Sequence, residues 1–167
     1  MTVRPAQTDE LSRVYRLTHD LTSGMSVTRH VVSCKRDRKL RSGTQFVLEN
    51  DGGEFVSTLT TYVYRQFPVA TVVGIANLFT SAPLRHRGYA SRLVDGTVAH
   101  YERDGQQIFY LLSDIGGEFY SRLGFRPLPL VYEGAPECLP MLRCPPEDWE
   151  RLSTHVPFLR GLMAFVD

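Results

Sequence analysis

Residues 85–90 read Arg85-His86-Arg87-Gly88-Tyr89-Ala90, and they join a strand-like run over residues 71–80 to a helix-like run that starts at about Tyr89. A chain that turns from strand to helix through such a loop leaves several backbone N–H groups unpaired at the positive end of the helix dipole. That end of a helix is a ready site for phosphate. Gly88 lets a phosphate approach without a Cβ in the way, and Arg85 and Arg87 add positive charge. We therefore predict an anion site, which a mononucleotide, a dinucleotide or another phosphate ester could use.

The chain is long and apolar enough for one α/β domain with a substantial core, because it has 167 residues of which 43% are hydrophobic. Its formal net charge of +1 gives no overall field that favours nucleic acid, so we expect no nucleic-acid partner. The basic stretch from Lys35 to Arg41 is a local exception. It is either the solvated end of a helix or a contact for an anionic ligand or partner.

The three cysteines are an odd number without CxxC spacing, which argues against a disulfide framework and a structural zinc site. The five histidines are scattered without ligand spacing, so no metal is expected. No apolar signal segment opens the chain, and no run approaches the ~18 apolar residues of a membrane span. We expect a soluble, unprocessed protein in a reducing cytoplasm, without a membrane partner.

Strands and helices alternate along the chain in a pattern typical of a mixed sheet. Strands are predicted at residues 3–6, 44–49, 55–64, 69–80, 108–112, 125–132 and 139–144. Helices are predicted from Thr8 or Asp9 onward, at 27–40, at 89–103 and at 115–123, with a tight turn at 50–53. The order predicts a mixed sheet with helices on both faces.

The tail from Pro145 opens as a helix start and carries many apolar side chains. It either packs on the core or docks to a second subunit or partner domain, so a homodimer is one expected arrangement. We divide the chain into a domain over residues 1–144 and a helical tail over 145–167.

Two motifs resemble the GCN5-related N-acetyltransferase (GNAT) family when taken as a pair. The first runs from Leu78-Phe79-Thr80 to Arg85-His86-Arg87-Gly88-Tyr89-Ala90, and the second is Phe119-Tyr120-Ser121-Arg122-Leu123-Gly124-Phe125. Each motif is short and could occur alone by chance. The two motifs together, in this order, at this spacing and with a helix-strand pattern between them, are not expected by chance. The resemblance covers about residues 3–144 and implies a single-domain, mixed and mostly antiparallel twisted sheet with helices on both faces.

The resemblance also implies an acyl-CoA site. In that family the amides of the positions that match His86 to Ser91 hold the pyrophosphate, and the strand before the loop pairs with the pantetheine arm through its backbone. The family often has an asparagine where this chain has Ser113, whose hydroxyl cannot make the paired contacts of an amide. The implied cofactor-binding residues are Leu78, Phe79, Thr80, Arg85, His86, Arg87, Gly88, Tyr89, Ala90, Ser91 and Ser113.

Tyr120 matches the position at which the family places a general acid for the departing CoA thiolate. A thiol of pKa ~8.5 leaves far more easily than an amine, so a phenol can give the modest help required. A packed core tyrosine would have the same sequence pattern. The base that deprotonates the attacking amine stays open among Asp114, Glu118, Glu54 and a water chain; Asp114 could instead be a helix N-cap, and Glu118 could pair with Arg122.

These implications favour an enzyme that moves acetyl from acetyl-CoA to a primary amine by direct attack in a ternary complex. Tyr62, Tyr64 and Tyr132 are expected near the acceptor, which is a small molecule or a peptide. One alternative is a non-catalytic acyl-CoA-binding module that senses the cofactor or serves in assembly. A second alternative is a nucleotide-binding domain that uses the same loop.

Overall fold

The computed structural model describes residues 1–22, 24–65 and 70–164, which form two compact units. One unit comprises Met1–Tyr62 with Ile75–His100, and the other comprises Val63–Gly74 with Tyr101–Asp167. The strands follow the order β1-β2-β3-β4-β5-β7-β6, and β4 (Val72–Thr80) contributes residues to both units. The predicted mixed, mostly antiparallel sheet is confirmed. The predicted boundary after Cys144 stays a prediction.

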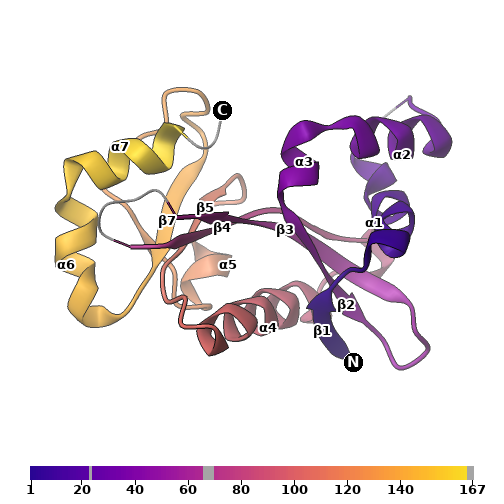
Figure 1. The fold of residues 1–167 in the computed structure, drawn as a ribbon, viewed down its shortest axis with the longest axis horizontal. Coiled ribbons are helices and arrows are strands. Elements are labelled where there is room, and N and C mark those ends of the chain that lie inside the picture. Colours follow the sequence, from indigo (N-terminus) through magenta and orange to yellow (C-terminus); the bar gives the residue numbers. More distant parts are fainter. Residues whose placement is uncertain (23, 66–69, 165–167) are drawn as a thin grey trace. The chain divides into compact units, whose positions relative to one another are not determined.

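The first unit places helices on both faces of its strands, with α1, α2 and α3 on one side and α4 on the other (Figure 1). Its elements are β1 (Thr2–Pro5), α1 (Leu11–Leu17), α2 (Val27–Arg36), α3 (Arg38–Ser42), β2 (Thr44–Glu49) and most of β3 (Phe55–Tyr64) and α4 (Tyr89–Arg103). The last residues of β3 and α4 belong to the second unit. Short 3-10 helices cover Thr8–Glu10, Thr18–Leu21 and Ala82–Leu84. The predicted bounds of β2, β3 and α4 are confirmed.

The β2–β3 hairpin owes its register to the turn predicted at residues 50–53. The Asn50 side-chain oxygen accepts from the backbone N–H groups of Gly52 and Glu54, at 3.0 and 2.8 Å. Gly53 closes the turn with a φ of +77°, a conformation that glycine adopts without strain. The strands then pair antiparallel from Thr44↔Thr61 onward, with an irregularity at Leu48/Glu49.

The helix predicted over residues 27–40 is wrong in one respect, because the chain forms two helices that meet at Asp37. Asp37 is extended, with φ −65° and ψ 118°, and so ends α2. Its side chain accepts from the backbone N–H of Leu40 at 3.0 Å and caps the next helix. The signal was the Asp itself, a strong N-cap residue inside an otherwise helical run.

A side-chain hydrogen-bond chain crosses three strands of the first unit. Asn77 Nδ2 donates to Thr60 Oγ1 at 3.3 Å, and Thr60 Oγ1 donates to Gln45 Oε1 at 3.0 Å. Gln45 Nε2 in turn donates to the carbonyl of Leu40 in α3, at 3.5 Å. Asn77 lies within β4 with a φ of 53°, so the strand is irregular there. The chain of bonds links α3 to this irregular point.

The second unit comprises the beginning of β4 and the elements from β5 onward. These are β5 (Phe109–Ser113), α5 (Glu118–Ser121), β6 (Arg126–Pro127), β7 (Leu139–Arg143), α6 (Pro146–Thr154) and α7 (Val156–Ala164). β4 and β5 run parallel, with Val73 opposite Phe109 and Gly74 opposite Tyr110. β7 pairs antiparallel with β5 and with β6.

Three predicted elements of this unit are shorter than expected. The strand predicted over 125–132 is confined to residues 126–127, because Pro127 and Pro129 have no N–H for a ladder. The helix predicted over 115–123 comprises only residues 118–121. β4 begins at Val72, and Val69, the predicted start, lies outside the described residues.

The apolar side chains of the tail pack within the second unit. Leu152 of α6 and Phe158 and Leu162 of α7 are almost completely buried. They share one cluster with strand residues, among them Val72 and Leu142. Arg126 covers the ring of the half-buried Trp149 at 3.7 Å. Across the described residues, no helix has the length and apolar character needed to cross a membrane.

Candidate functional site

The loop before α4 has the open geometry expected of an anion site. His86 and Gly88 both have positive φ, at 61° and 76°. The first backbone bond of the helix is donated by Arg92 to the carbonyl of Gly88, at 3.0 Å. In the described ranges, the backbone N–H groups from His86 to Ser91 have no hydrogen-bond acceptor. Six successive donors at a helix start are therefore free to bind an anion.

Two observations explain why position 88 is occupied by glycine. Its φ of +76° strains any residue with a side chain. A Cβ built on it would meet nothing within 4 Å, so the space in front of the backbone is open. A phosphate fits here, because a negatively charged oxygen can approach backbone donors that no side chain shields.

The two loop arginines keep their charge available. Arg85, His86 and Arg87 are exposed, and no carboxylate of the described residues forms an ion pair with any of them. Arg85 Nε donates to the carbonyl of Thr80 at 3.1 Å, which ties the loop back to the end of β4. The positive potential at the helix start is therefore reinforced by side-chain charge.

The strand before the loop is fixed by a hydroxyl from β3. Ser57 Oγ lies 2.8 Å from both the carbonyl of Phe79 and the hydroxyl of Thr80. Phe79 is buried, whereas Leu78 and Thr80 are partly exposed. The carbonyl of Phe79 accepts from Ser57 Oγ and the carbonyl of Thr80 accepts from Arg85 Nε, so side chains on both sides hold this backbone in place.

Tyr120 lies on the short helix α5 of the second unit and is 7% exposed. Its ring makes edge contacts with Phe119 and Phe125, with centroids 4.8 and 5.9 Å apart. Its hydroxyl makes no hydrogen bond to a described residue. Burial, with a smaller effect of Asp114, raises the pKa of Tyr120 to about 12. The phenol therefore stays protonated throughout the neutral range.

The predicted N-cap role of Asp114 is wrong. α5 begins at Glu118 with Gly117 in the N-cap position, and Asp114 is exposed in the preceding turn. The reason is local: Ser113 Oγ donates to the carbonyl of Gly116, and Gly116 has a φ of +78°. The turn occupies residues 114–116, so the helix starts only after it.

The other predicted polar residues have structural partners. The Ser113 side chain is 1% exposed and its proton is engaged by the Gly116 carbonyl, so toward a ligand its hydroxyl is an acceptor. Glu118 pairs with Arg122, as predicted. Glu54 is exposed in the first unit, next to the start of β3. Ser113, Asp114 and Tyr120 thus belong to one unit, and the loop residues belong to the other.

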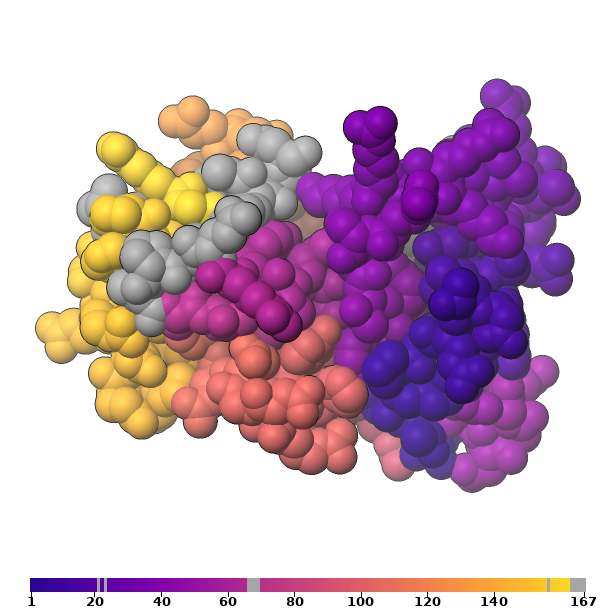
Figure 2. Space-filling model, in the orientation of Figure 1, coloured from indigo at the N-terminus to yellow at the C-terminus, as the bar shows by residue number. Residues whose placement is uncertain are grey.

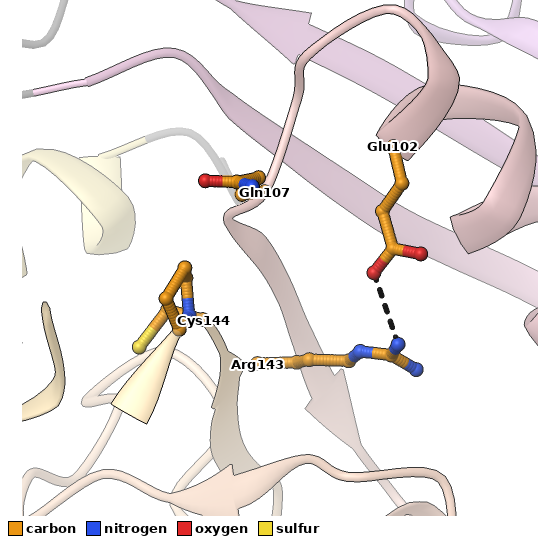
Figure 3. A pocket seen from close by; sticks show the side chains of 5 residues that line it. Glu102, Gln107, Arg143 and Cys144 are labelled. Carbon is orange, nitrogen blue, oxygen red and sulfur yellow. Dashed lines mark hydrogen bonds and ion pairs between the residues drawn. The ribbon is translucent and has the colours of Figure 1, made fainter. Parts of the chain in front are cut away.

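The second unit contains a polar pocket, which was not predicted from the sequence (Figure 3). It has a volume of about 360 Å³ and is lined by Glu102, Gln107, Arg143, Cys144 and Pro145. Arg143 donates to Glu102 and to the carbonyl of Leu123, both at 3.0 Å. Burial raises the pKa of the Cys144 thiol, which therefore stays a thiol. The pocket contains none of the predicted site residues.

The described residues contain no group of three or more His, Cys, Asp or Glu side chains able to hold a metal ion.

Comparisons with known proteins agree with the fold. A family model described as an Acetyltransferase (GNAT) domain matches residues 2–128. The structure of the GNAT family N-acetyltransferase YhbS from Escherichia coli in complex with CoA is similar, with a TM-score of 0.65 and 20% identity, over 88% of this chain and 82% of that one. A comparison with curated proteins found no match.

Two further solved structures share the fold. A histone acetyltransferase HPA2 and related acetyltransferase from Corynebacterium glutamicum has a TM-score of 0.63 and 19% identity, over 86% of this chain and 96% of that one. An aminoglycoside 6'-acetyltransferase type Ii has a TM-score of 0.60 and 18% identity, over 86% of this chain and 97% of that one.

Proposed function

The chain belongs to the GNAT acetyltransferase family, and from that premise we propose that it transfers an acetyl group from acetyl-CoA to a primary amine. The acceptor is a small molecule or a peptide. The observation that carries the proposal is the row of unpaired backbone donors from His86 to Ser91, beside the exposed Arg87. These groups fit a pyrophosphate, which is the most highly charged part of CoA.

Each predicted cofactor residue receives a role that its surroundings permit. The amides of His86 to Ser91 bind the pyrophosphate, and Arg85 and Arg87 neutralise its charge. The backbone of Leu78, Phe79 and Thr80 pairs with the pantetheine arm as an added strand would. Ser113 contributes at most an accepted bond, since its proton is engaged by Gly116.

Acetyl-CoA supplies an activated acyl group and a thiolate leaving group. The amine nitrogen forms a bond to the acyl carbon, the carbon–sulfur bond breaks, and the sulfur gains a proton. We assign that proton to Tyr120. With a pKa of about 12, this phenol holds its proton more tightly than a thiol of pKa ~8.5. It therefore donates a hydrogen bond that stabilises the negative charge developing on sulfur. Full transfer of the proton to sulfur is coupled to reprotonation of Tyr120 from solvent.

The amine loses its own proton by one of two routes. Asp114 is the candidate carboxylate, because it is exposed and belongs to the same unit as Tyr120. The other route is a chain of water molecules. Asp114→Asn distinguishes the routes: a carboxylate base predicts loss of the acidic limb of the kcat/KM profile, and a water chain predicts an unchanged profile.

The first experiment is a thiol-release screen with acetyl-CoA against amines, amino acids, aminoglycosides and peptides. The proposal predicts thiol release that depends on one class of amine. If CoA raises the melting temperature while no amine releases thiol, the chain is a binding module. If a dinucleotide stabilises the chain and CoA does not, the loop serves another ligand.

Two variants test the residue roles once an acceptor is known. Tyr120→Phe should lower kcat by about 10²-fold, the lower end of general-acid effects, because thiolate leaves readily. Tyr15→Phe is the matched control, since Tyr15 is a buried tyrosine of the first unit and should leave kcat unchanged. Arg87→Ala should raise the KM for acetyl-CoA by roughly tenfold through loss of one charge-assisted contact, whereas Arg103→Ala should not. Unchanged kcat in Tyr120→Phe would remove the acid assignment.

A further inference from the structure

A strongly basic segment on the first unit contains none of the residues assigned above to acetyl-CoA. Six cations lie within residues 27–42, on α2 and α3, and the same stretch contains one carboxylate, Asp37. We call this set the basic face: Arg29, Lys35, Arg36, Arg38, Lys39 and Arg41. Because the whole chain has a net charge of only +1, the rest of the chain is net negative. The positive charge is thus concentrated in one short segment.

Most of the charge on the basic face has no partner among the described residues. All six side chains are exposed, and the purple side chains of this part of the chain project from the surface in Figure 2. Asp37 is engaged as the cap of α3, through the backbone N–H of Leu40. Within the described parts of the chain, five of the six side chains form no ion pair and no side-chain hydrogen bond: Arg29, Lys35, Arg36, Arg38 and Arg41.

An exposed apolar side chain, that of Val32, lies among these cations. It is 41% exposed, whereas Val27, which is 42% exposed, lies three and four residues before His30 and Val31 and so on the other side of the helix. Val32 lies three residues after Arg29 and four before Arg36, so the three share one side of α2. The opposite side of α2 is buried at His30 and Val31. The outer side therefore presents apolar contact area between positive charges.

We propose that the basic face is a docking surface for an acidic polypeptide segment with apolar side chains between its carboxylates. Guanidinium groups match carboxylates in two-bonded geometry, and the exposed Val32 gives a polypeptide apolar contact that a sugar-phosphate backbone does not need. Residues 27–42 contain no aromatic side chain on which a base could stack or that could anchor in a bilayer. The apolar side of α2 is already buried, so the helix cannot insert into lipid.

The test is a binding assay by fluorescence anisotropy with the full chain and a labelled peptide of repeated Glu-Glu-Leu units. Binding should weaken as salt is raised, because the charges are exposed. Arg29→Glu/Arg36→Glu should weaken it by at least about tenfold. The matched control is Arg103→Glu/Arg160→Glu, which reverses two exposed helical arginines of the second unit and should change the affinity less than about twofold.

The substitution Val32→Ser distinguishes the kinds of partner, because it keeps the charge and removes the apolar contact. It should weaken the Glu-Glu-Leu peptide by several-fold and leave duplex DNA and phosphatidylserine vesicles unaffected. Equal or tighter binding of duplex DNA or of the vesicles, with no effect of the valine variant on the peptide, would overturn the proposal. So would peptide binding that the arginine reversals leave intact. Acyl transfer is scored separately, and the proposal does not depend on it.

Discussion

Gly96 is the point at which helix α4 approaches strand β1 most closely. A Cβ built on Gly96 would lie 2.6 Å from Val3 Cγ2 and 2.7 Å from Val3 Cβ. Rotating the Val3 side chain would move Cγ2 but not Cβ, which is fixed to the backbone. The substitution Gly96→Ala therefore forces the helix or the strand to shift.

Two opposing effects decide the size of that perturbation. Overpacking of this kind costs about 1–3 kcal/mol, and alanine in place of glycine inside a helix gains about 1 kcal/mol. We expect Gly96→Ala to lower the free energy of unfolding by up to about 2 kcal/mol. Urea unfolding followed by circular dichroism measures it. Ala99→Gly, at an exposed position of the same helix, calibrates the helix-propensity effect alone.

The sign of the effect should depend on the residue at position 3. With Val3→Gly every close contact is gone, so adding Gly96→Ala should now stabilise the chain by up to about 1 kcal/mol. With Val3→Ala the contact to Cβ stays, and an intermediate loss is expected. Equal destabilisation by Gly96→Ala in all three backgrounds would refute the steric explanation.

Other substitutions test the second unit and the charge network. Phe158→Ala should lower the free energy of unfolding by about 3–5 kcal/mol, because Phe158 is completely buried. The control Pro157→Ala, at an exposed position, should not lower it, and thermal unfolding compares the two variants. Gly74→Ala should destabilise by about 1–3 kcal/mol, because its Cβ would lie 2.9 Å from the ring of Tyr64. The bond from Arg4 lowers the pKa of Glu10 from 4.5 to about 2, so its stabilisation is complete above pH 4.5 and is lost as the pH falls toward 2. Glu10→Gln should flatten urea-unfolding stability across that window, and an unchanged slope would contradict the assignment.

The sequence predicted the elements whose determinants are local. The hairpin of β2 and β3 has alternating strands and a turn held by Asn50, and the loop before α4 has its own glycine and cations. Its open amides follow from helix geometry alone. These features do not depend on distant residues, which is why their predicted bounds are correct.

Features that depend on competition between signals were harder to predict. Asp37 is compatible with a continuing helix, and only the capping bond to Leu40 shows that it ends one helix and starts another. Helix α5 starts three residues later than predicted, because the hydroxyl of Ser113 donates to the Gly116 carbonyl and closes a turn before the helix. The acceptor pocket could not be predicted, because it would be built from loops that are remote in sequence.

The hydrogen-bond chain from Asn77 to Leu40 has a fixed direction. The hydroxyl of Thr60 has a single proton, which goes to Gln45 Oε1, so it must accept from Asn77. Gln45 therefore cannot flip its amide without losing the bond to the Leu40 carbonyl as well. Asn is among the residues that adopt a positive φ most readily, and at Asn77 the directed bonds add to that preference. A substitution in α3 that moves the Leu40 carbonyl should therefore affect the strand that leads to the anion loop.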